Sequence, residues 1–204
     1  MLKVYGRSAS SNVQKVLWCC GEIGLPFELL DIGAAFGGTR TPGYLALNPN
    51  GLMPTIDDDG FLLWESNAVV RYLAAKHGAG TLWPTDLRAR ADADRWMDWQ
   101  QTTLAAPMGV AFRAWLKQPP DAMPADQARA ALDKAGEGWR ILEARLADRP
   151  YVGGAELTIG DIALGNAVHR WFRLPIERPE LPNVRAWYER LCARPAYRQY
   201  VASF

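Results

Sequence analysis

VYGRSASSNVQKVLWCC, residues 4–20, joins a predicted strand to a predicted helix through a run of small polar residues. Its apolar positions 13, 16, 17 and 20 follow the i, i+3, i+4, i+7 spacing of a helix with one buried face. Ser10, Ser11 and Asn12 stand where that helix begins, and a helix N-terminus carries N–H groups that have no partner inside the helix. These side chains therefore either cap the helix or act on a group that meets its N-terminus.

The residues that follow predict a small α/β domain. Residues 27–32 read as a second strand, which completes a βαβ unit. Residues 54–56 and 61–64 flank the sequence DDDG, whose Asp-Gly pair is typical of a hairpin turn. Ser66 is then expected to cap a helix that ends near residue 77. This order of elements predicts a thioredoxin-like domain over residues 1–78.

From residue 87 onward the periodicity predicts helices alone, after a linker of turn-forming residues at 78–84. A long helix over 87–116 is expected to be interrupted by Pro107, and a second amphipathic helix lies between the prolines at 124 and 150. The sequence TIGD at 158–161 has the form of a capping box and opens a buried helix. Residues 87–204 therefore predict an all-α helical bundle domain.

Charge and composition exclude several classes of protein. The chain of 204 residues has 23 Lys and Arg against 22 Asp and Glu, so no strong field attracts nucleic acid or an anionic membrane. No leader-like or membrane-spanning run is present, and the 3 cysteines lack zinc or CxxC spacing. The DDDG segment lacks the ligand spacing of a calcium loop. We expect a cytoplasmic protein with no metal, no nucleic-acid partner and no membrane partner.

Four pieces of sequence carry a resemblance to a known family. They are the serine-rich start of the first helix, NPNGLMPT at 48–55, WESNA at 64–68 and the TIGD box at 158–161. In this order and at these spacings the chain resembles the cytosolic glutathione transferase superfamily over essentially its whole length, in a bacterial, serine-type (theta- or nu-like) branch. The resemblance implies a cytoplasmic detoxification enzyme that takes glutathione as co-substrate and works as a homodimer.

The resemblance also implies which residues ionise the thiol of glutathione. The hydroxyl that contacts the thiolate falls on Ser10, with Ser11 and Asn12 as close competitors and Tyr5 where other classes use a tyrosine. A thiol pKa near 8.5 must fall by about two units, which requires roughly 2.7 kcal/mol. A hydroxyl that donates to the thiolate contributes about 1.5 to 3 kcal/mol, and a helix N-terminus about 0.3 to 2 kcal/mol.

The remaining contacts with glutathione follow from the same resemblance. A cis Pro54 lets the backbone of Met53 pair with the cysteinyl amide. The Ser66 hydroxyl, at the start of its helix, faces the γ-glutamyl carboxylate, and Glu65 pairs with the α-ammonium. Without the resemblance, Ser66 reads as a plain helix cap.

One departure from the family pattern concerns the glycyl end of glutathione. Many relatives carry a polar side chain just before the residue that precedes the cis-proline, but Gly51 and Leu52 stand here. Thr39 or Arg40 is the candidate replacement, although an arginine in a glycine-rich loop is also compatible with simple solvation.

The electrophile is expected between the two domains, against the first long helix of the second. Trp96, Trp99 and Thr103 recur at i, i+3, i+7, with Gln100 beside them. They either line an apolar pocket or fill the helix core. The predicted function is a glutathione transferase that acts on a small hydrophobic electrophile; the alternative is a non-catalytic binding or interaction module on the same fold.

The homodimer implied by the resemblance suggests two helical surfaces. Arg71 and Tyr72 on the helix after Ser66 are of types enriched at interfaces. The helix after residue 87 offers the acidic partners Asp92, Asp94 and Asp98.

Overall fold

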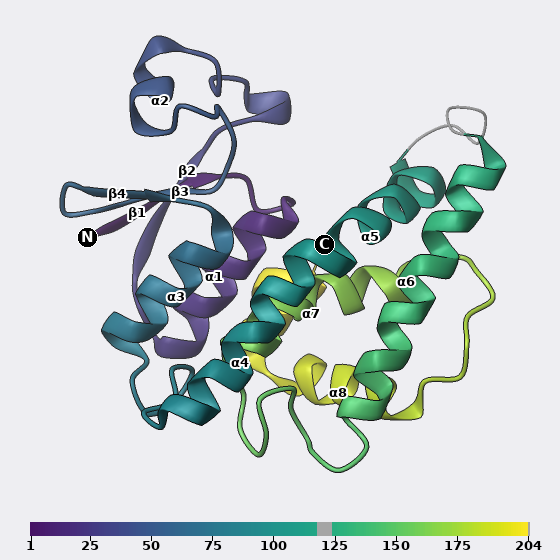
Figure 1. Cartoon of the computed structure of the whole chain (residues 1–204). Helices are drawn as coiled ribbons and strands as arrows, with labels where there is room; N and C mark the ends of the chain where they lie inside the picture. The colour runs from purple at the N-terminus through teal and green to yellow at the C-terminus, as the bar shows by residue number, and fades with distance from the viewer. Residues whose placement is uncertain (118–123, 204) are drawn as a thin grey trace. The chain divides into compact units, whose positions relative to one another are not determined.

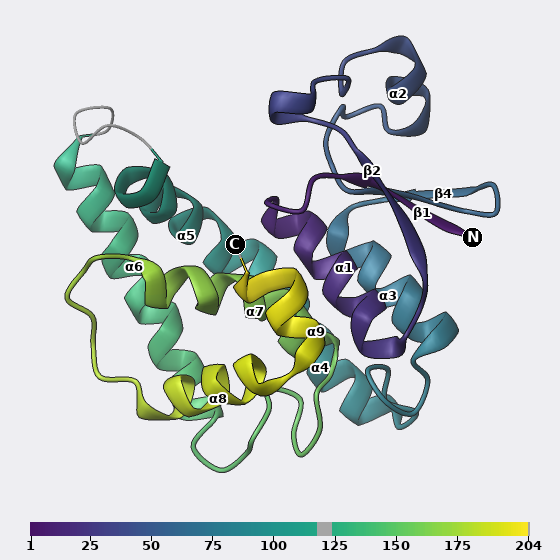
Figure 2. The same cartoon turned by 180° about the vertical axis from the view of Figure 1, so that it is seen from behind.

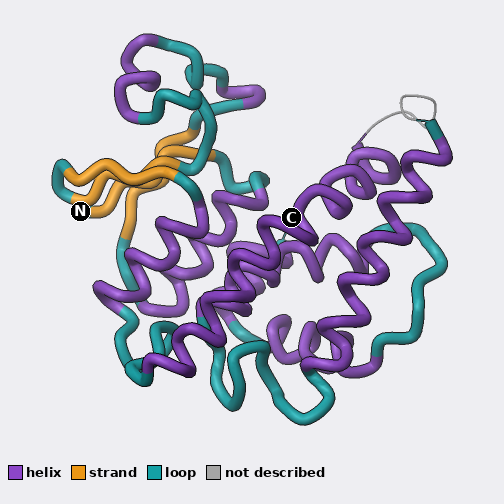
Figure 3. Tube along the Cα trace, in the orientation of Figure 1, coloured by secondary structure: helices purple, strands orange, loops and turns teal. Residues whose placement is uncertain are grey.

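A computed structural model describes residues 1–117 and 124–203 of the chain (Figure 1). Its contacts divide the chain into two compact units. The first unit comprises Met1–Thr85 together with the C-terminal segment that begins at Arg194, and the second comprises Asp86–Ala193. Figure 3 shows the strands gathered in the first unit; in the described part of the second, only an isolated bridge joins Tyr151 and Gly154.

The first unit has the thioredoxin-like arrangement that the sequence predicts. Its strands are β1 (Leu2–Gly6), β2 (Phe27–Asp31), β3 (Thr55–Asp58) and β4 (Phe61–Trp64), in the spatial order β2-β1-β3-β4. β1 runs parallel to β2, and the other pairs are antiparallel. The parallel pair follows from the crossover through α1 (Ser11–Ile23), because parallel strands cannot be joined by a tight turn.

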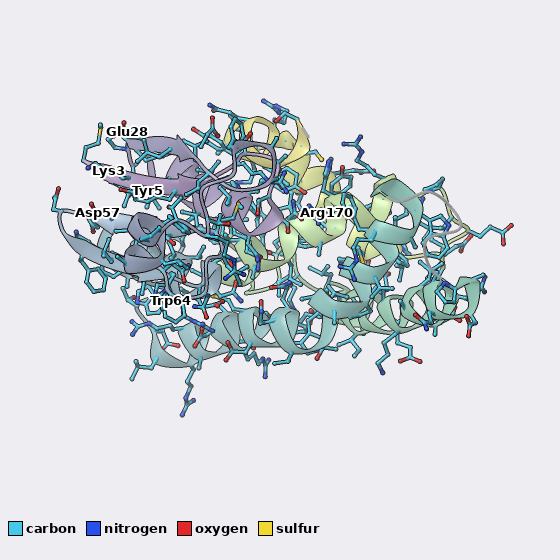
Figure 4. The ribbon with its side chains drawn as sticks, turned by 90° about the horizontal axis from the view of Figure 1, so that it is seen from above. Lys3, Tyr5, Glu28, Asp57, Trp64 and Arg170 are labelled. Atoms are coloured by element: carbon cyan, nitrogen blue, oxygen red, sulfur yellow. The ribbon has the colours of Figure 1, made fainter. Side chains whose placement is uncertain are left out.

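Helices cover one face of this sheet. α1 and α3 (Ser66–His77) lie side by side on that face, and α2 (Pro42–Leu47) lies beyond the other (Figure 1). Alternate residues of β1 are buried, among them Leu2 and Val4, while Lys3 and Tyr5 are half-buried. Figure 4 shows Lys3 close to Glu28 and Asp57, with which it is in register on the neighbouring strands.

Two local expectations are corrected in this unit. β3 extends to Asp58, so the hairpin turn is Asp59-Gly60 alone, with the positive φ angles of 51° and 93° that a type I′ turn requires. α3 begins at Ser66 with Glu65 in the N-cap position, so the expectation that Ser66 caps this helix is wrong. The φ of 72° at Glu65 turns the chain out of β4 directly into the helix, and Ser66 is already helical and buried.

The C-terminal segment belongs with the first unit, whereas the predicted boundary of 87–204 grouped it with the helical domain. Tyr197 of α9 (Pro195–Tyr197) packs edge-on against Trp18 with ring centroids 4.8 Å apart. The guanidinium of Arg194 donates two hydrogen bonds, of 2.9 and 2.7 Å, to the carboxylate of Glu22. Figure 2 shows α9 beside α1. Helical periodicity predicts the helix but does not specify which core its apolar face joins.

The second unit is built from helices around α7 (Ile159–Arg173), most of whose residues are buried. α4 (Leu87–Trp99), α5 (Ala105–Phe112) and α8 (Pro182–Ala193) contact α7, and α6 (Ala125–Arg145) packs against α5 and α8. Gly160 permits the close approach of α4, because a Cβ there would lie 2.9 Å from the carbonyl oxygen of Ala93.

The interruption of the long helix differs from the expectation. α4 and α5 are joined by a π-helical segment, Gln100–Leu104, and Pro107 lies inside α5. A proline lacks the N–H for an α-helical bond to the residue four positions earlier and crowds that residue's carbonyl, here Thr103. The wider turn over 100–104 accommodates this loss without ending the helix.

The capping box at Thr158 and Asp161 is present, as predicted. Asp161 is fully buried and accepts four hydrogen bonds, from the N–H and hydroxyl of Thr158, the N–H of Val152 and Nε1 of Trp187. Burial raises the pKa of this carboxyl, and the four donors oppose that rise.

In residues 1–117 and 124–203, no helix combines the length and apolar character needed to cross a membrane.

Candidate functional site

The N-terminus of α1 exposes polar groups without partners in the helix. Ser10 is the N-cap residue, with extended backbone angles, and its carbonyl accepts from the N–H of Gln14 at 2.8 Å. The Ser10 hydroxyl makes no capping bond, so it is not used to complete the helix. Ser11 is half-buried as the first helical residue and Asn12 is exposed as the second. The structure thus brings all three candidate donors to one helix end.

Tyr5, the fourth candidate, lies on β1 rather than at that helix end. Its ring packs against Tyr44 of α2, with centroids 6.2 Å apart. It projects from the sheet on the same side as Lys3, away from the buried Val4 (Figure 4). Tyr5 therefore points away from α1, which covers the opposite face of the sheet.

The loop before β3 contains the cis peptide bond between Met53 and Pro54 that the resemblance implies. The preceding carbonyl, of Leu52, accepts from the Tyr44 hydroxyl at 2.6 Å and from Nδ2 of Asn48 at 2.9 Å. Both donors also reach the Thr55 hydroxyl, at 3.0 and 3.1 Å. Within the described chain the backbone N–H and C=O of Met53 make no hydrogen bond, so they are available to an extended ligand.

Sequence reasoning assigned no role to Tyr44 or Asn48. Asn48 was part of a motif used for the family resemblance, but nothing in the motif indicates that its amide supports the Leu52 carbonyl. The sequence feature that could have indicated this role is the turn-forming run NPNG at 48–51. Asparagine side chains commonly form hydrogen bonds with nearby backbone groups in such turns. Here Oδ1 of Asn48 accepts from the N–H of Asn50 at 3.0 Å.

The glycine-rich loop approaches the residues before the cis-proline. Gly51 has φ of 60°, and a Cβ on it would lie 2.8 Å from the Thr39 carbonyl oxygen and 2.9 Å from Nη1 of Arg40. Glycine therefore permits both the backbone conformation and the contact. The structure brings Thr39 and the exposed Arg40 close to Gly51, two residues before Met53.

The start of α3 contains a buried polar contact that the sequence analysis missed. Asn67 follows Ser66, both are nearly inaccessible, and Oδ1 of Asn67 accepts from Nζ of Lys15 at 3.1 Å. Lys15 is 3% exposed. Burial lowers its pKa to about 7, although the nearby charge of Glu65 acts in the opposite direction. The sequence feature that could have indicated this contact is a basic residue, Lys15, among the apolar positions of α1.

The four candidates for the electrophile site separate in the structure. Trp96 is buried in the helical unit, where Trp99 meets its ring edge-on at a centroid distance of 5.3 Å. Both tryptophans line a cavity of about 400 Å³, together with Arg95 and Ile141. Gln100 and Thr103 lie on the π-helical segment and do not line this cavity.

Two side chains expected at a dimer contact are engaged within the chain. The Tyr72 hydroxyl donates to Asp58 at 2.6 Å. Asp92 forms ion pairs with Arg95 and with Arg145 of the same chain. Among the described residues, no three His, Cys, Asp or Glu side chains gather as they would around a metal ion.

Comparisons with known proteins cover nearly the whole chain. A family model described as the glutathione S-transferase N-terminal domain matches residues 9–76, and one described as the C-terminal domain matches residues 125–190. Glutathione S-transferase GstB of Escherichia coli K12 is 36% identical over 203 residues, which span 98% of each chain. Glutathione S-transferase 3 of Zea mays is 33% identical over 99% of this chain and 94% of its own length.

A solved structure is similar in both fold and sequence. The theta class glutathione S-transferase of Xanthomonas axonopodis pv. citri, crystallised with glutathione bound, superposes with a TM-score of 0.94. It is 46% identical in sequence, and the match covers 98% of this chain and 96% of that one.

Proposed function

The chain belongs to the cytosolic glutathione S-transferase superfamily, and from this premise we propose that it ionises the thiol of glutathione at the N-terminus of α1 and adds the thiolate to a small apolar electrophile. The relatives described above are glutathione S-transferases, and the chain matches them over nearly their full length. The chain is therefore an enzyme of this kind, with glutathione as co-substrate.

In the proposed reaction the Ser10 hydroxyl donates to the sulfur anion, and the positive end of the α1 dipole adds to that stabilisation. The thiol proton passes to solvent. The sulfur then forms a bond to the electrophilic carbon, and the leaving group departs from that carbon with the bonding electron pair. The enzyme lowers the barrier because thiolate is the reactive species and thiol is not.

Three parts of the first unit are proposed to bind the rest of the tripeptide. The backbone of Met53 pairs with the cysteinyl amide, since its N–H and C=O have no partner within the described chain. Ser66 and Glu65 receive the γ-glutamyl carboxylate and ammonium. Arg40 takes the glycyl carboxylate, because its guanidinium lies against Gly51 and close to the cis-proline loop.

The electrophile is proposed to bind along the helix that carries Trp99, Gln100 and Thr103. The half-buried Trp99 supplies an apolar surface, and Trp96, buried behind it, supports that ring. Gln100 and Thr103 lie outside the cavity lined by the two tryptophans, and their polar groups on the adjoining π-helical segment are proposed to contact a polar part of the electrophile. We further propose that the enzyme is a cytoplasmic homodimer that detoxifies such electrophiles.

The observation that contributes most to this proposal is the Ser10 hydroxyl, which is left without a capping bond at the N-terminus of α1. It occurs in a chain that is 46% identical to a transferase crystallised with glutathione. The alternative, a binding module without chemistry, draws support from Leu52, which is 59% exposed where many relatives carry a polar side chain.

Two measurements on the purified chain separate these functions. Retention on immobilised glutathione tests binding, and the rate of conjugate formation with a chlorodinitrobenzene tests chemistry. A transferase shows both, with elution by free glutathione. Retention without conjugation above the uncatalysed rate favours the binding module, and the absence of both contradicts the proposed function.

A further inference from the structure

Lys15 is the most unusual charged residue of the first unit. It is 3% exposed on α1, five residues after Ser10, in a helix whose apolar Val13 and Val16 are also buried. A buried ammonium is unfavourable unless it has a partner, and a methionine would fill similar space without that penalty. The position therefore has to be explained by what the ammonium contacts.

Its contacts lie at the start of α3. Nζ donates to Oδ1 of Asn67 at 3.1 Å, in a buried hydrogen bond that joins α1 to α3. The Glu65 charge is close enough to favour the protonated form of Lys15. One side chain thus acts on both neighbours of Ser66, and Ser66 and Glu65 are the residues proposed to receive the γ-glutamyl end.

This corner of the chain requires external support. Glu65 adopts φ of 72°, in a region that non-glycine residues rarely occupy, and its side chain makes no capping bond. Such a conformation persists only when its surroundings determine it. The Lys15 to Asn67 bond fixes the residue that follows Ser66, and attraction between Lys15 and Glu65 acts on the residue before it.

We propose that Lys15 is a positioning residue for glutathione: by holding residues 65–67 at the start of α3, it orients the groups that bind the γ-glutamyl end. The inference rests on the proposed function. Lys15 is too deeply buried to touch the tripeptide itself, so it acts through Asn67 and Glu65. Its loss should weaken affinity and leave the chemical step unchanged, because its bond to Asn67 acts on the residues proposed to bind the γ-glutamyl end, whereas the Ser10 hydroxyl is proposed to act on the sulfur.

The test compares Lys15→Met with the full-length wild type in glutathione kinetics and in calorimetric titration with S-methylglutathione, which has no thiol to ionise. We expect Lys15→Met to raise KM and the S-methylglutathione Kd about tenfold while kcat stays within twofold of wild type. Lys15→Arg, which keeps the charge and a donor, should recover most of the affinity. Equal changes in kcat and KM, or an unchanged KM, overturn the proposal.

A matched control separates positioning from loss of packing. Val16→Ala removes buried methyl groups next to Lys15 on the same helix but no hydrogen-bonding group, so it should lower the melting temperature without raising KM. If it raises KM as much as Lys15→Met, Lys15 has only a structural role. Asn67→Leu removes the same hydrogen bond from the other partner, so it should raise KM as Lys15→Met does. The double variant should bind glutathione no more weakly than either single variant.

Failure of this inference can be told from failure of the proposed function. If the wild type binds neither glutathione nor S-methylglutathione, both fail. If the wild type binds, Ser66→Ala weakens binding and Lys15→Met binds as tightly as wild type, the positioning role alone is overturned.

Discussion

Ser10 is the residue on which the proposed chemistry depends, and one hydroxyl could in principle cap a helix or stabilise a thiolate. The structure leaves it without a capping bond. We therefore expect Ser10→Ala to reduce kcat for conjugation by about tenfold to a hundredfold, the equivalent of about 1.4 to 2.7 kcal/mol, with a much smaller change in KM. Ser66→Ala should do the reverse. Steady-state kinetics with varied glutathione at saturating electrophile distinguishes the two.

The neighbouring hydroxyls and the Asn12 amide serve as controls for that assignment. Ser11→Ala, Asn12→Ala and Tyr5→Phe each remove one alternative donor. A full rate in Ser10→Ala, with a loss in one of these three variants, would transfer the role to that residue. The pH dependence of kcat should change with the same variant, since the donor lowers the thiol pKa.

Lys15 predicts a pH dependence of stability. Its pKa is 10.5 in an unfolded reference and about 7 when buried, so between these values the unfolded chain holds a proton that the folded chain has released. Raising the pH through this window therefore favours the folded state, by about 2 kcal/mol between pH 7 and 9. Below pH 7 both states are protonated and the penalty of burial is fully present.

The measurement is the difference in unfolding free energy between wild type and Lys15→Met at pH 6, 7.5 and 9, from urea titrations. Methionine does not titrate, so other groups cancel in the difference. The unfolding free energy of the wild type should increase relative to that of Lys15→Met as the pH rises. Parallel pH curves would show that Lys15 does not titrate as its burial indicates.

At this scale the sequence predicts side chains that follow a motif and misses those whose role depends on tertiary packing. The cis bond at Pro54 was predicted from the resemblance and is confirmed. Lys15 could not be assigned, because its environment depends on Asn67, which is 52 residues away in sequence. The same holds for Tyr44, whose role depends on the path of the loop that returns to Thr55.

Among the elements, α7 depends on a single carboxylate at its N-terminus. Asp161 accepts four hydrogen bonds while fully buried, and two of its donors lie outside the capping box, on Val152 and Trp187. Asp161→Asn places an NH₂ group against at least one existing N–H donor whichever way the amide turns. We expect a loss of about 3 to 5 kcal/mol in unfolding free energy, measured by urea denaturation.

Glu156→Gln is the matched control for Asp161→Asn. Glu156 is an exposed acid a few residues away and should change stability by less than about 0.5 kcal/mol. Equal stability of Asp161→Asn and wild type would mean that the four bonds contribute no net stabilisation.

Element types were more predictable than the places where elements join. Apolar spacing predicted α6 and α7 because a helix periodicity is local. The start of α3 was misplaced by one residue, since the left-handed Glu65 is imposed by the return from β4 and not by its own preference. The interruption of the long helix was expected at Pro107 but lies at the π-helical segment Gln100–Leu104, because sequence shows the missing N–H and not the wider turn that accommodates it.

For the whole molecule, the C-terminal segment shows what sequence order conceals. Its residues follow the helical unit in the chain but pack on α1, through Tyr197 and the ion pair of Arg194 with Glu22. Glu22 is also the acceptor for Nε1 of Trp18 at 2.7 Å. A domain boundary drawn from periodicity at a single linker cannot detect a segment that returns to the first core.

The proposed homodimer is tested best at β4, the last strand in the sheet order and therefore an edge. Three large apolar side chains of this edge strand are 37–49% exposed: Phe61, Leu62 and Trp64. Exposed apolar edge strands are uncommon in monomeric proteins, because they promote pairing with another chain. In a homodimer, a second copy of the chain would cover the apolar side chains of β4. Light scattering at micromolar concentration should give twice the single-chain mass of 22.7 kDa.

Leu62→Glu places a charge on that edge and should shift the mass toward 22.7 kDa. Phe36→Glu is the control, since Phe36 is 60% exposed on the short helix Ala34–Phe36 and lies outside β4. It should leave the mass unchanged, which separates loss of the interface from a general effect of added charge. A wild type with the single-chain mass would contradict the dimer, and dissociation by Phe36→Glu but not by Leu62→Glu would place the interface away from β4.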